Sequence, residues 1–233
     1  MINRPIFFKL VKETFYKSGM KQEVVDGLNA MLDEWYKRNL TDLRWLAYMM
    51  GTVYRETGYT FQPVREGFYI SSSFDKAEAW RKKNLRYYPW YGRGWPQLTW
   101  ESNYKKQQEK LGIDLTSVLG REKLLLMPVS AAVLFGGMID GDFTGGKHKL
   151  STYFNATKED WFNARRIVNI LDKAQTYADL SKKFYDILKK SDTNATAPIV
   201  VAPKGGDPVS PAVPEGKKEH WFIRLLKALF RGK

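Results

Sequence analysis

Residues 42–56 read DLRWLAYMMGTVYRE, and this stretch has the apolar spacing of a core helix. Leu46, Met49, Met50 and Val53 recur at intervals of one, three or four residues, which places them on one face of a helix with 3.6 residues per turn. Helical spacing also appears in residues 23–38, 74–83, 100–111, 128–139 and 158–190. The sequence therefore predicts a mainly helical fold, with a long aromatic and Gly-rich loop region between residues 57 and 95.

The composition fits one domain with an appendage. The chain has 233 residues, of which 43% are hydrophobic and 15% aromatic, so it can bury a sizeable core. It has no Cys and only two His, which excludes a disulfide framework and thiolate catalysis and argues against a zinc site. We expect neither a metal nor an organic cofactor.

A formal net charge of +13 favours polyanionic partners, although charge alone does not choose between nucleic acid, anionic lipid and the phosphates of bacterial envelopes. The basic residues form no recognisable nucleic-acid motif, so no specific nucleic acid is expected. The first 19 residues lack the apolar core of a secretory signal, and no run approaches the roughly 18 apolar residues of a membrane span. These features predict a monomer that is synthesised in the cytoplasm without a signal peptide.

The composition changes near residue 190 and divides the chain into three parts. Residues 1–190 are the expected catalytic domain, and residues 191–216, which hold five prolines, are the expected linker. Residues 217–233 form a basic amphipathic pattern suited to an anionic membrane or a lipopolysaccharide surface. The alternative for this last segment is a helix docked on the catalytic domain through its apolar face.

Glu56 is the candidate general acid. It continues the apolar face of its predicted helix, where partial burial would raise the pKa of its carboxyl. The alternative is a last-turn Glu that only reaches solvent. Cleavage of a glycosidic bond with inversion also needs a second carboxylate. Glu66 is the nearest candidate, with Glu78 and Asp75 further along, while an ion pair of Glu66 with Arg65 or Arg55 is the competing interpretation.

Residues 91–100, with the sequence YGRGWPQLTW, combine tight-turn glycines with groups suited to sugars. Gln97, Thr99 and the nearby Asn103 offer neutral hydrogen-bonding groups for hydroxyls and acetamides. Tyr91, Trp95 and Trp100 offer apolar faces for pyranose rings. The alternative is an aromatic turn that packs on the core.

This segment resembles the signature of glycoside hydrolase family 19, the chitinase-like fold, and especially its phage endolysin branch. The resemblance extends over roughly residues 40–190, through Ala47 to Glu66, Gly137 to Gly145 and Ala164 to Ala174. It implies a lysozyme-like helical domain in which Glu56 is the general acid and Thr99 helps to hold the attacking water. It further implies that substrate is bound by Tyr91, Arg93, Gln97, Trp100, Asn103 and Asn169, with Arg165 or Arg166 supporting the carboxylates.

The expected activity is therefore that of an endolysin that hydrolyses the β-1,4 bond between N-acetylmuramic acid and N-acetylglucosamine, with inversion at the anomeric carbon. Such a protein would meet its substrate, peptidoglycan, in the periplasm or cell wall of a bacterial host. The alternatives are a chitinase of the same fold and a non-catalytic cationic protein that binds the envelope.

Overall fold

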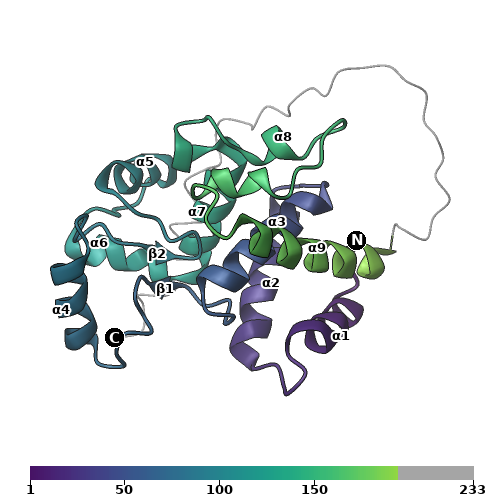
Figure 1. The fold of residues 1–233 in the computed structure, drawn as a ribbon, viewed down its shortest axis with the longest axis horizontal. Helices are drawn as coiled ribbons and strands as arrows, with labels where there is room; N and C mark the ends of the chain where they lie inside the picture. The colour runs from purple at the N-terminus through teal and green to yellow at the C-terminus, as the bar shows by residue number, and fades with distance from the viewer. Residues whose placement is uncertain (194–233) are drawn as a thin grey trace. The chain divides into compact units, whose positions relative to one another are not determined.

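The computed structural model describes residues 1–193, which form a mainly helical unit, as the helical spacing predicts. The predicted helix at 217–233 and the predicted linker beyond Thr193 lie outside the described residues. Figure 1 shows the arrangement of the elements. The α-helices are α1 (Arg4–Phe15), α2 (Gln22–Lys37), α3 (Leu43–Glu56), α4 (Phe74–Asn84), α5 (Glu101–Leu111), α6 (Val118–Glu122), α7 (Met127–Asp140), α8 (Leu150–Tyr153) and α9 (Ala174–Ser191). The short remaining elements are strands β1 (Val64–Arg65) and β2 (Arg93–Gly94) and 3-10 helices η1 (Lys123–Leu125), η2 (Asp142–Thr144) and η3 (Asn163–Ile167).

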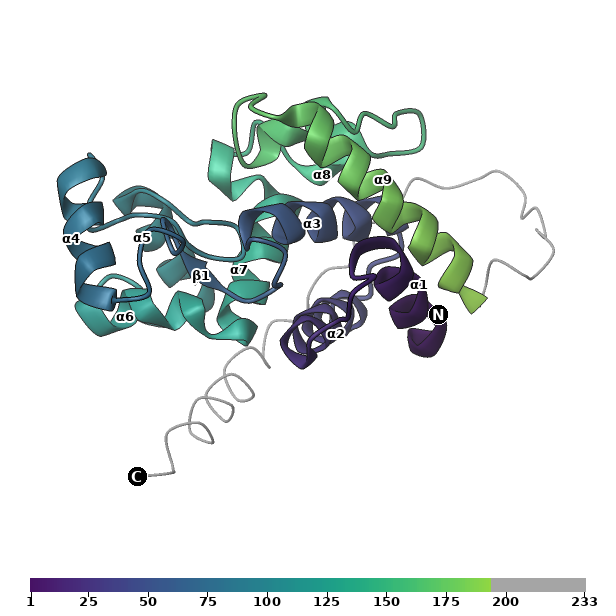
Figure 2. The ribbon, with the colours of Figure 1, turned by 60° about the horizontal axis from the view of Figure 1, so that its bottom comes forward.

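Helix α3 lies at the centre of the group of helices that forms most of the core. It packs against α9, α7 and α2, while α1 packs against α9. Both ribbon views place α1, α2 and α9 toward one end of the unit and α4, α5 and α6 toward the other (Figures 1 and 2). The side chains of Leu46, Met49, Met50 and Val53 are fully buried, as their spacing predicts.

Local sequence signals explain where the core helices begin and end. The Asp42 carboxylate accepts a hydrogen bond of 3.0 Å from the backbone N–H of Arg44 and so caps the start of α3. Pro128 lies in the first turn of α7, where its missing N–H costs no helical hydrogen bond. Gly112 and Gly141 end α5 and α7 in the left-handed conformation, with φ of 64° and 76°.

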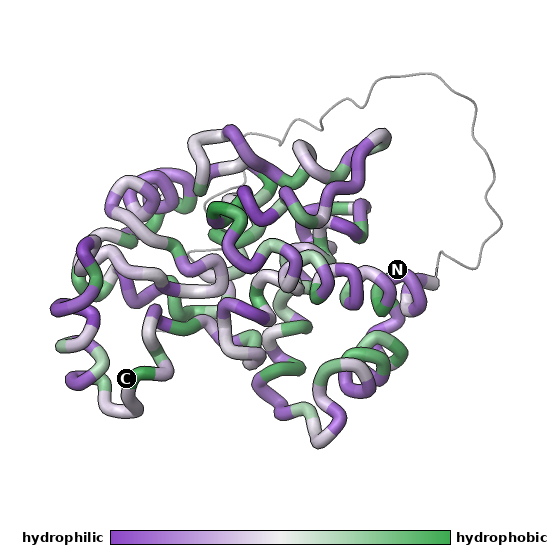
Figure 3. The backbone as a smooth tube through the Cα atoms, in the orientation of Figure 1, coloured by the Kyte–Doolittle hydropathy of each residue, from purple (hydrophilic) through white to green (hydrophobic). Residues whose placement is uncertain are grey.

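Residues 57–126, which link α3 to α7, contain a two-stranded antiparallel sheet in which Val64 pairs with Gly94 and Arg65 with Arg93. This sheet falls in the region that the sequence suggests is loop. Helices α4 and α5 are mostly hydrophilic along the tube in Figure 3. Each of these two helices therefore buries only two residues, Ala77 and Arg81 in α4 and Tyr104 and Gln107 in α5.

Among the described helices, no single one is long and apolar enough to cross a membrane. The bent pair of Val118–Leu125 and Met127–Asp140 meets that test only when the two segments are taken together, across an 83° bend.

The expectation of a helix over residues 158–190 is wrong in its first half. Residues 154 and 159 form a β-bridge, and the Asp160 carboxylate accepts a 3.0 Å hydrogen bond from the backbone N–H of Asn163, which closes a turn. Lys173 has a φ of 53°, so a regular helix cannot pass through it, and α9 begins only at the next residue. Helix α1 is absent from the sequence-based expectation altogether.

The two ends of the described unit meet. The Met1 amino group forms an ion pair of 2.8 Å with Asp192, and the Asn3 N–H donates to the Ser191 carbonyl at 2.7 Å. Residues 2 and 192 form an antiparallel bridge. The start of the chain is thereby fastened to the end of α9.

Candidate active site

Glu56 is the last residue of α3, and two side chains contact the same oxygen of its carboxylate. The Tyr177 hydroxyl donates a hydrogen bond of 2.7 Å to Oε1, and the Arg165 guanidinium lies 3.2 Å from the same atom. The Glu56 side chain is 23% exposed, whereas that of Arg165 is 3% exposed. Glu56 is therefore held from the buried side and open on the other.

The two partners of Glu56 also contact each other. The Arg165 guanidinium lies 3.8 Å from the centre of the Tyr177 ring, and its Nε donates to the Asp172 carbonyl at 3.2 Å. Burial, and after it the charge of Glu56, raises the pKa of the Tyr177 hydroxyl, so this group keeps its proton and remains a donor. Of the two arginines that the resemblance offers, Arg165 contacts Glu56, and Arg166 lines a separate cavity.

Glu66 directly follows β1 and is held by two uncharged donors. Its Oε1 accepts from the Tyr87 hydroxyl at 2.6 Å, and its Oε2 accepts from the Gly92 backbone N–H at 2.9 Å. The competing ion pair with Arg65 is not formed, because Arg65 pairs with Glu122. Within residues 1–193, Glu66 makes no ion pair with Arg55 either. Each of its oxygens has one donor and keeps a lone pair for water.

The two other candidates for the second carboxylate lie away from Glu56. Glu78 accepts from the Tyr91 hydroxyl at 2.9 Å and pairs with Arg81 at 3.0 Å. Burial opposes ionisation of Glu78, but these hydrogen bonds outweigh it and lower the pKa of its carboxyl. Asp75 is exposed in the first turn of α4. Neither residue lines either of two cavities that Glu56 lines, whereas Glu66 lines both.

The turn at residues 91–100 is anchored from inside by its glycines and Trp95. A side chain at Gly94, which has a φ of 78°, would approach the Leu124 carbonyl to 2.9 Å. The Trp95 backbone N–H donates to the Ser130 hydroxyl at 2.6 Å, and its indole N–H donates to the Phe61 carbonyl at 2.8 Å. Trp95 is fully buried, so its expected role as a sugar platform is wrong.

Tyr91 and Arg93 are also buried, at 1% and 3% exposure, and the expectation that they bind substrate is wrong. The Arg93 guanidinium lies 3.6 Å from the centre of the Tyr91 ring, donates to the Tyr104 hydroxyl at 3.0 Å and pairs with Glu122 at 3.1 Å. These contacts occupy the polar groups that the motif would otherwise offer to a ligand. Both residues therefore stabilise the turn from its buried side.

The residues that follow the buried anchors face the cleft. Both amide hydrogens of Gln97 are used, since Nε2 donates to the Val64 carbonyl at 3.1 Å and to the Gly94 carbonyl at 2.9 Å. Thr99 donates its hydroxyl hydrogen to the Gln97 carbonyl at 2.7 Å. Gln97 Oε1 and Thr99 Oγ1 therefore remain as acceptors for a ligand or a water.

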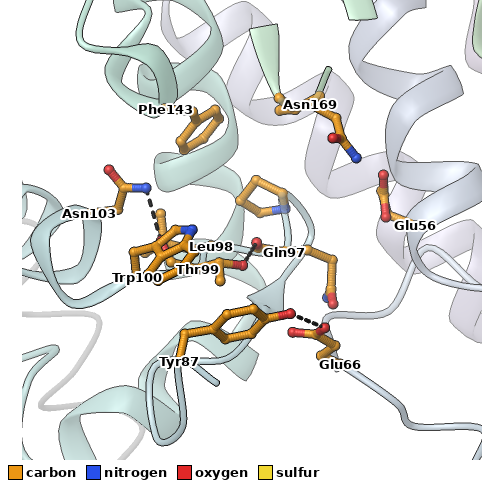
Figure 4. Close-up of a pocket in the computed structure, with 12 residues that line it drawn as sticks. Glu56, Glu66, Tyr87, Gln97, Leu98, Thr99, Trp100, Asn103, Phe143 and Asn169 are labelled. Carbon is orange, nitrogen blue, oxygen red and sulfur yellow. Dashed lines mark hydrogen bonds between the residues drawn. The ribbon is translucent and has the colours of Figure 1, made fainter. Parts of the chain in front are cut away.

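Trp100, Asn103 and Asn169 complete the polar and aromatic lining. Trp100 is 45% exposed and adopts a φ of 75°, which is rare for a bulky residue and tends to mark functional sites. Asn103 donates to the Thr99 carbonyl at 2.9 Å, while the Asn169 side-chain oxygen accepts from the Ile170 N–H at 2.7 Å. The Asn169 side-chain nitrogen points toward Glu56 (Figure 4).

Two adjoining cavities share a wall formed by Glu56, Glu66, Gln97 and Asn169. The Trp100 cavity, of about 400 Å³, is lined in addition by Thr99, Asn103, Tyr87, Phe143 and Val168, among others (Figure 4). The Tyr69 cavity, of about 530 Å³, is lined in addition by Arg55, Phe68, Arg165, Lys173 and Tyr177, among others. The carboxylates thus lie where two ligand-sized spaces meet, with room on both sides for an extended molecule.

Several lining residues have no local sequence signal of their role. Tyr177 lies 121 residues from Glu56, and no spacing rule connects the two. Phe143 has a weak signal in Gly137, because a side chain at Gly137 would overlap the Phe143 ring. Tyr87 is one of many aromatic residues in its stretch, and nothing distinguishes it in the sequence.

Within residues 1–193, no group of three or more His, Cys, Asp or Glu side chains is arranged to hold a metal ion. The site therefore offers carboxylates, neutral amides, a threonine hydroxyl and aromatic faces for its chemistry. Comparison with protein families, curated proteins and solved structures found nothing that matches this chain.

Proposed function

We propose that this protein is a glycoside hydrolase that cleaves the β-1,4 bond between N-acetylmuramic acid and N-acetylglucosamine in bacterial peptidoglycan. The observation that carries the proposal is that Glu56 and Glu66, from different elements, both line the shared wall of two cavities. Hydrolysis of a glycosidic bond uses two carboxyl groups on either side of the reacting sugar. The neutral amides and the exposed Trp100 suit acetamido sugars.

Glu56 suits the role of proton donor because both of its partners lie on Oε1. The proton is then carried by Oε2 and passes to the glycosidic oxygen as the bond breaks. The carboxylate left behind keeps the Arg165 guanidinium and the Tyr177 hydroxyl as partners on Oε1, and both stabilise its negative charge. Tyr177 supplies this hydrogen bond without losing its own proton.

Glu66 suits the role of base that activates water. Its two donors orient the carboxylate and leave lone pairs free. Thr99, whose hydrogen is used by the Gln97 carbonyl, offers its oxygen to a hydrogen of the same water. Direct attack by this water inverts the anomeric centre, so nuclear magnetic resonance of the first product is expected to show the opposite anomer to the substrate.

The test is digestion of purified sacculi by the full chain, with the released fragments identified by mass spectrometry. Glu56→Gln keeps the shape of the side chain but removes the transferable proton, so the rate is expected to fall by roughly 10²–10⁴-fold. Glu109→Gln is the matched control, because Glu109 is exposed on α5 and lines neither cavity. Full activity of the Glu56 variant would refute the assignment.

The same assay on chitin separates the alternatives. Cleavage of chitin but not of sacculi would identify a chitinase. Cleavage of neither would favour the other alternative, a non-catalytic cationic protein that binds the envelope. N-acetylmuramic acid at the new reducing ends identifies the bond proposed here. N-acetylglucosamine at those ends would place the cut at the other linkage.

A second part of the proposal concerns residues 217–233, whose basic and amphipathic sequence suits binding to the anionic envelope. Deletion of these residues is expected to reduce binding to vesicles that contain anionic lipid, with neutral vesicles as the control. Unchanged binding would refute an anchoring role for the segment.

A further inference from the structure

The cavities along the cleft differ in charge. The Trp100 cavity is lined by no Lys or Arg, and its only charged residues are Glu56 and Glu66. The Tyr69 cavity is lined by Arg55, Arg165 and Lys173. Every cationic side chain that lines either of these two cavities therefore belongs to the Tyr69 cavity.

Two of the cations in the Tyr69 cavity have no carboxylate partner. Arg165 is matched by Glu56, but among residues 1–193 neither Arg55 nor Lys173 forms an ion pair. Arg55 donates a hydrogen bond of 3.3 Å to the Tyr59 hydroxyl, and Lys173 is exposed. Glu66 lies on the wall that this cavity shares with the Trp100 cavity. Outside that wall, Arg55, Arg165 and Lys173 face a single carboxylate, that of Asp172.

A third cavity, the Arg166 cavity, repeats this pattern on another side of the Trp100 cavity. It has a volume of about 320 Å³, and it shares Phe143, Val168 and Asn169 with the Trp100 cavity. Arg166 lines it together with His148, and no carboxylate does. Within the described part of the chain, Arg166 forms no ion pair. Outside the wall that it shares with the Tyr69 cavity, the Trp100 cavity has no charged residue, and it adjoins Arg55, Arg165 and Lys173 in one direction and Arg166 in another.

We propose that the cleft recognises the alternation of charge along its glycan. The Tyr69 and Arg166 cavities take sugars whose substituent ends in a carboxylate, and the Trp100 cavity takes the uncharged acetamido sugar next to them. This inference rests on the proposed function and deepens it, because it assigns the two kinds of sugar in peptidoglycan to particular cavities. It also distinguishes peptidoglycan from chitin, in which no sugar carries a carboxylate.

The chemistry of the Tyr69 cavity fits a bulky acidic substituent. Tyr69 is 76% exposed and offers an aromatic face, while Arg55 and Lys173 offer hydrogen bonds and positive charge to a carboxylate. The carboxylate can belong to the lactyl ether of the sugar or to its peptide stem. In both cases the charge is present on alternate sugars only.

The test compares three forms of one substrate. Intact sacculi carry peptide carboxylates, sacculi amidated with a carbodiimide and ammonia carry none, and glycan strands stripped of peptide by an amidase carry lactyl carboxylates. KM is measured from the release of reducing ends for the wild-type chain, Arg55→Gln, Lys173→Gln and Arg166→Gln. Lys83→Gln is the matched control, because Lys83 is exposed on α4 and lines none of the three cavities.

For the wild-type chain, amidation is expected to raise KM several-fold. Each cleft variant is expected to raise KM on intact sacculi by about two- to five-fold, the range of an exposed ion pair, and to have little effect on amidated sacculi. Added salt is expected to reduce the difference between wild type and variant. Low KM on stripped strands identifies the lactyl carboxylate, and high KM on them identifies the peptide stem.

If the cleft variants raise KM equally on intact and amidated sacculi, or do not raise it at all, the charge assignment is overturned. The proposed hydrolase activity would not be affected by that result. A loss as large in Lys83→Gln as in the cleft variants would also overturn the charge assignment, because the effect would then be one of overall charge. Failure of the wild-type chain to release reducing ends from any glycan is a different result, since it would refute the proposed function itself.

Discussion

Gly51 of α3 lies directly against Ser181 of α9, and a methyl group there is expected to push the two helices apart. A side chain at Gly51 would lie 2.9 Å from the Ser181 backbone nitrogen and 3.0 Å from its Cα, and would also overlap its hydroxyl oxygen. The hydroxyl can be displaced, but backbone atoms of a packed helix cannot move by themselves. Gly51→Ala is therefore a test of the α3–α9 contact that brings Tyr177 to Glu56.

Two opposing effects set the magnitude. Overpacking of a buried contact costs about 1–3 kcal/mol, and the upper end applies here because backbone atoms are involved. Replacing Gly by Ala within a helix returns about 1 kcal/mol. The net loss is about 2 kcal/mol in the free energy of unfolding, which lowers Tm by roughly 4–8 °C for a domain of this size. Thermal unfolding followed by circular dichroism measures this shift.

Gly136→Ala is the matched control. Gly136 lies within α7, and a side chain there would meet no atom within 4 Å, so only the helix-forming advantage of Ala remains. We expect Gly136→Ala to raise Tm by roughly 2–4 °C. Ser181→Ala removes the hydroxyl but not the backbone atoms, so Gly51→Ala is expected to remain destabilising in that background. Equal stabilisation by both Gly→Ala changes would refute the reasoning.

Two further predictions concern the polar contacts of Tyr177 and Asp142. Tyr177→Phe removes one donor from Glu56 and is expected to lower kcat on sacculi about ten-fold with little change in KM; unchanged kcat would contradict this. At Asp142, burial opposes ionisation, but hydrogen bonds from Lys110 and Lys106 outweigh it and hold the pKa of the carboxyl below its ordinary 3.8. Its stabilising contribution is present above that value and is lost as pH falls through the folded pKa. Asp142→Asn is therefore expected to cost about 1–3 kcal/mol at neutral pH and less near pH 2, measured by urea unfolding; an equal cost at both would contradict it.

Helices α2 and α3 could be predicted because each buries one apolar face along its length. Helices α2, α3, α5 and α7 begin and end within one residue of the predicted bounds. Helix α1, which buries only Phe7 and Val11, has no counterpart among the predicted helices. The stretch before α9 is mispredicted because side-chain turns and a left-handed Lys173 interrupt a pattern that periodicity alone would continue.

The candidate site could be predicted only where neighbouring residues share it. Gln97, Thr99 and Asn103 follow one another on the rim of the cleft, and the structure brings them beside Glu56 and Glu66. A local motif does not distinguish the inner from the outer side of a turn, which is why the sequence predicts contact with substrate for the buried Tyr91 and Arg93. Contacts made by distant segments, such as Tyr177 with Glu56, depend on how α9 crosses α3 and leave no mark in either segment.

The fastening of residues 1–3 to residues 191–193 makes the folded unit close to a ring. In a chain shortened to residues 1–193, a short peptide could join these ends, and new ends could then be opened in an exposed loop, since termini that lie close together tolerate circular permutation. A permutant opened at exposed Gly145 would keep every core contact and both carboxylates in place. The order in which the helices leave the ribosome would change, while the architecture would not.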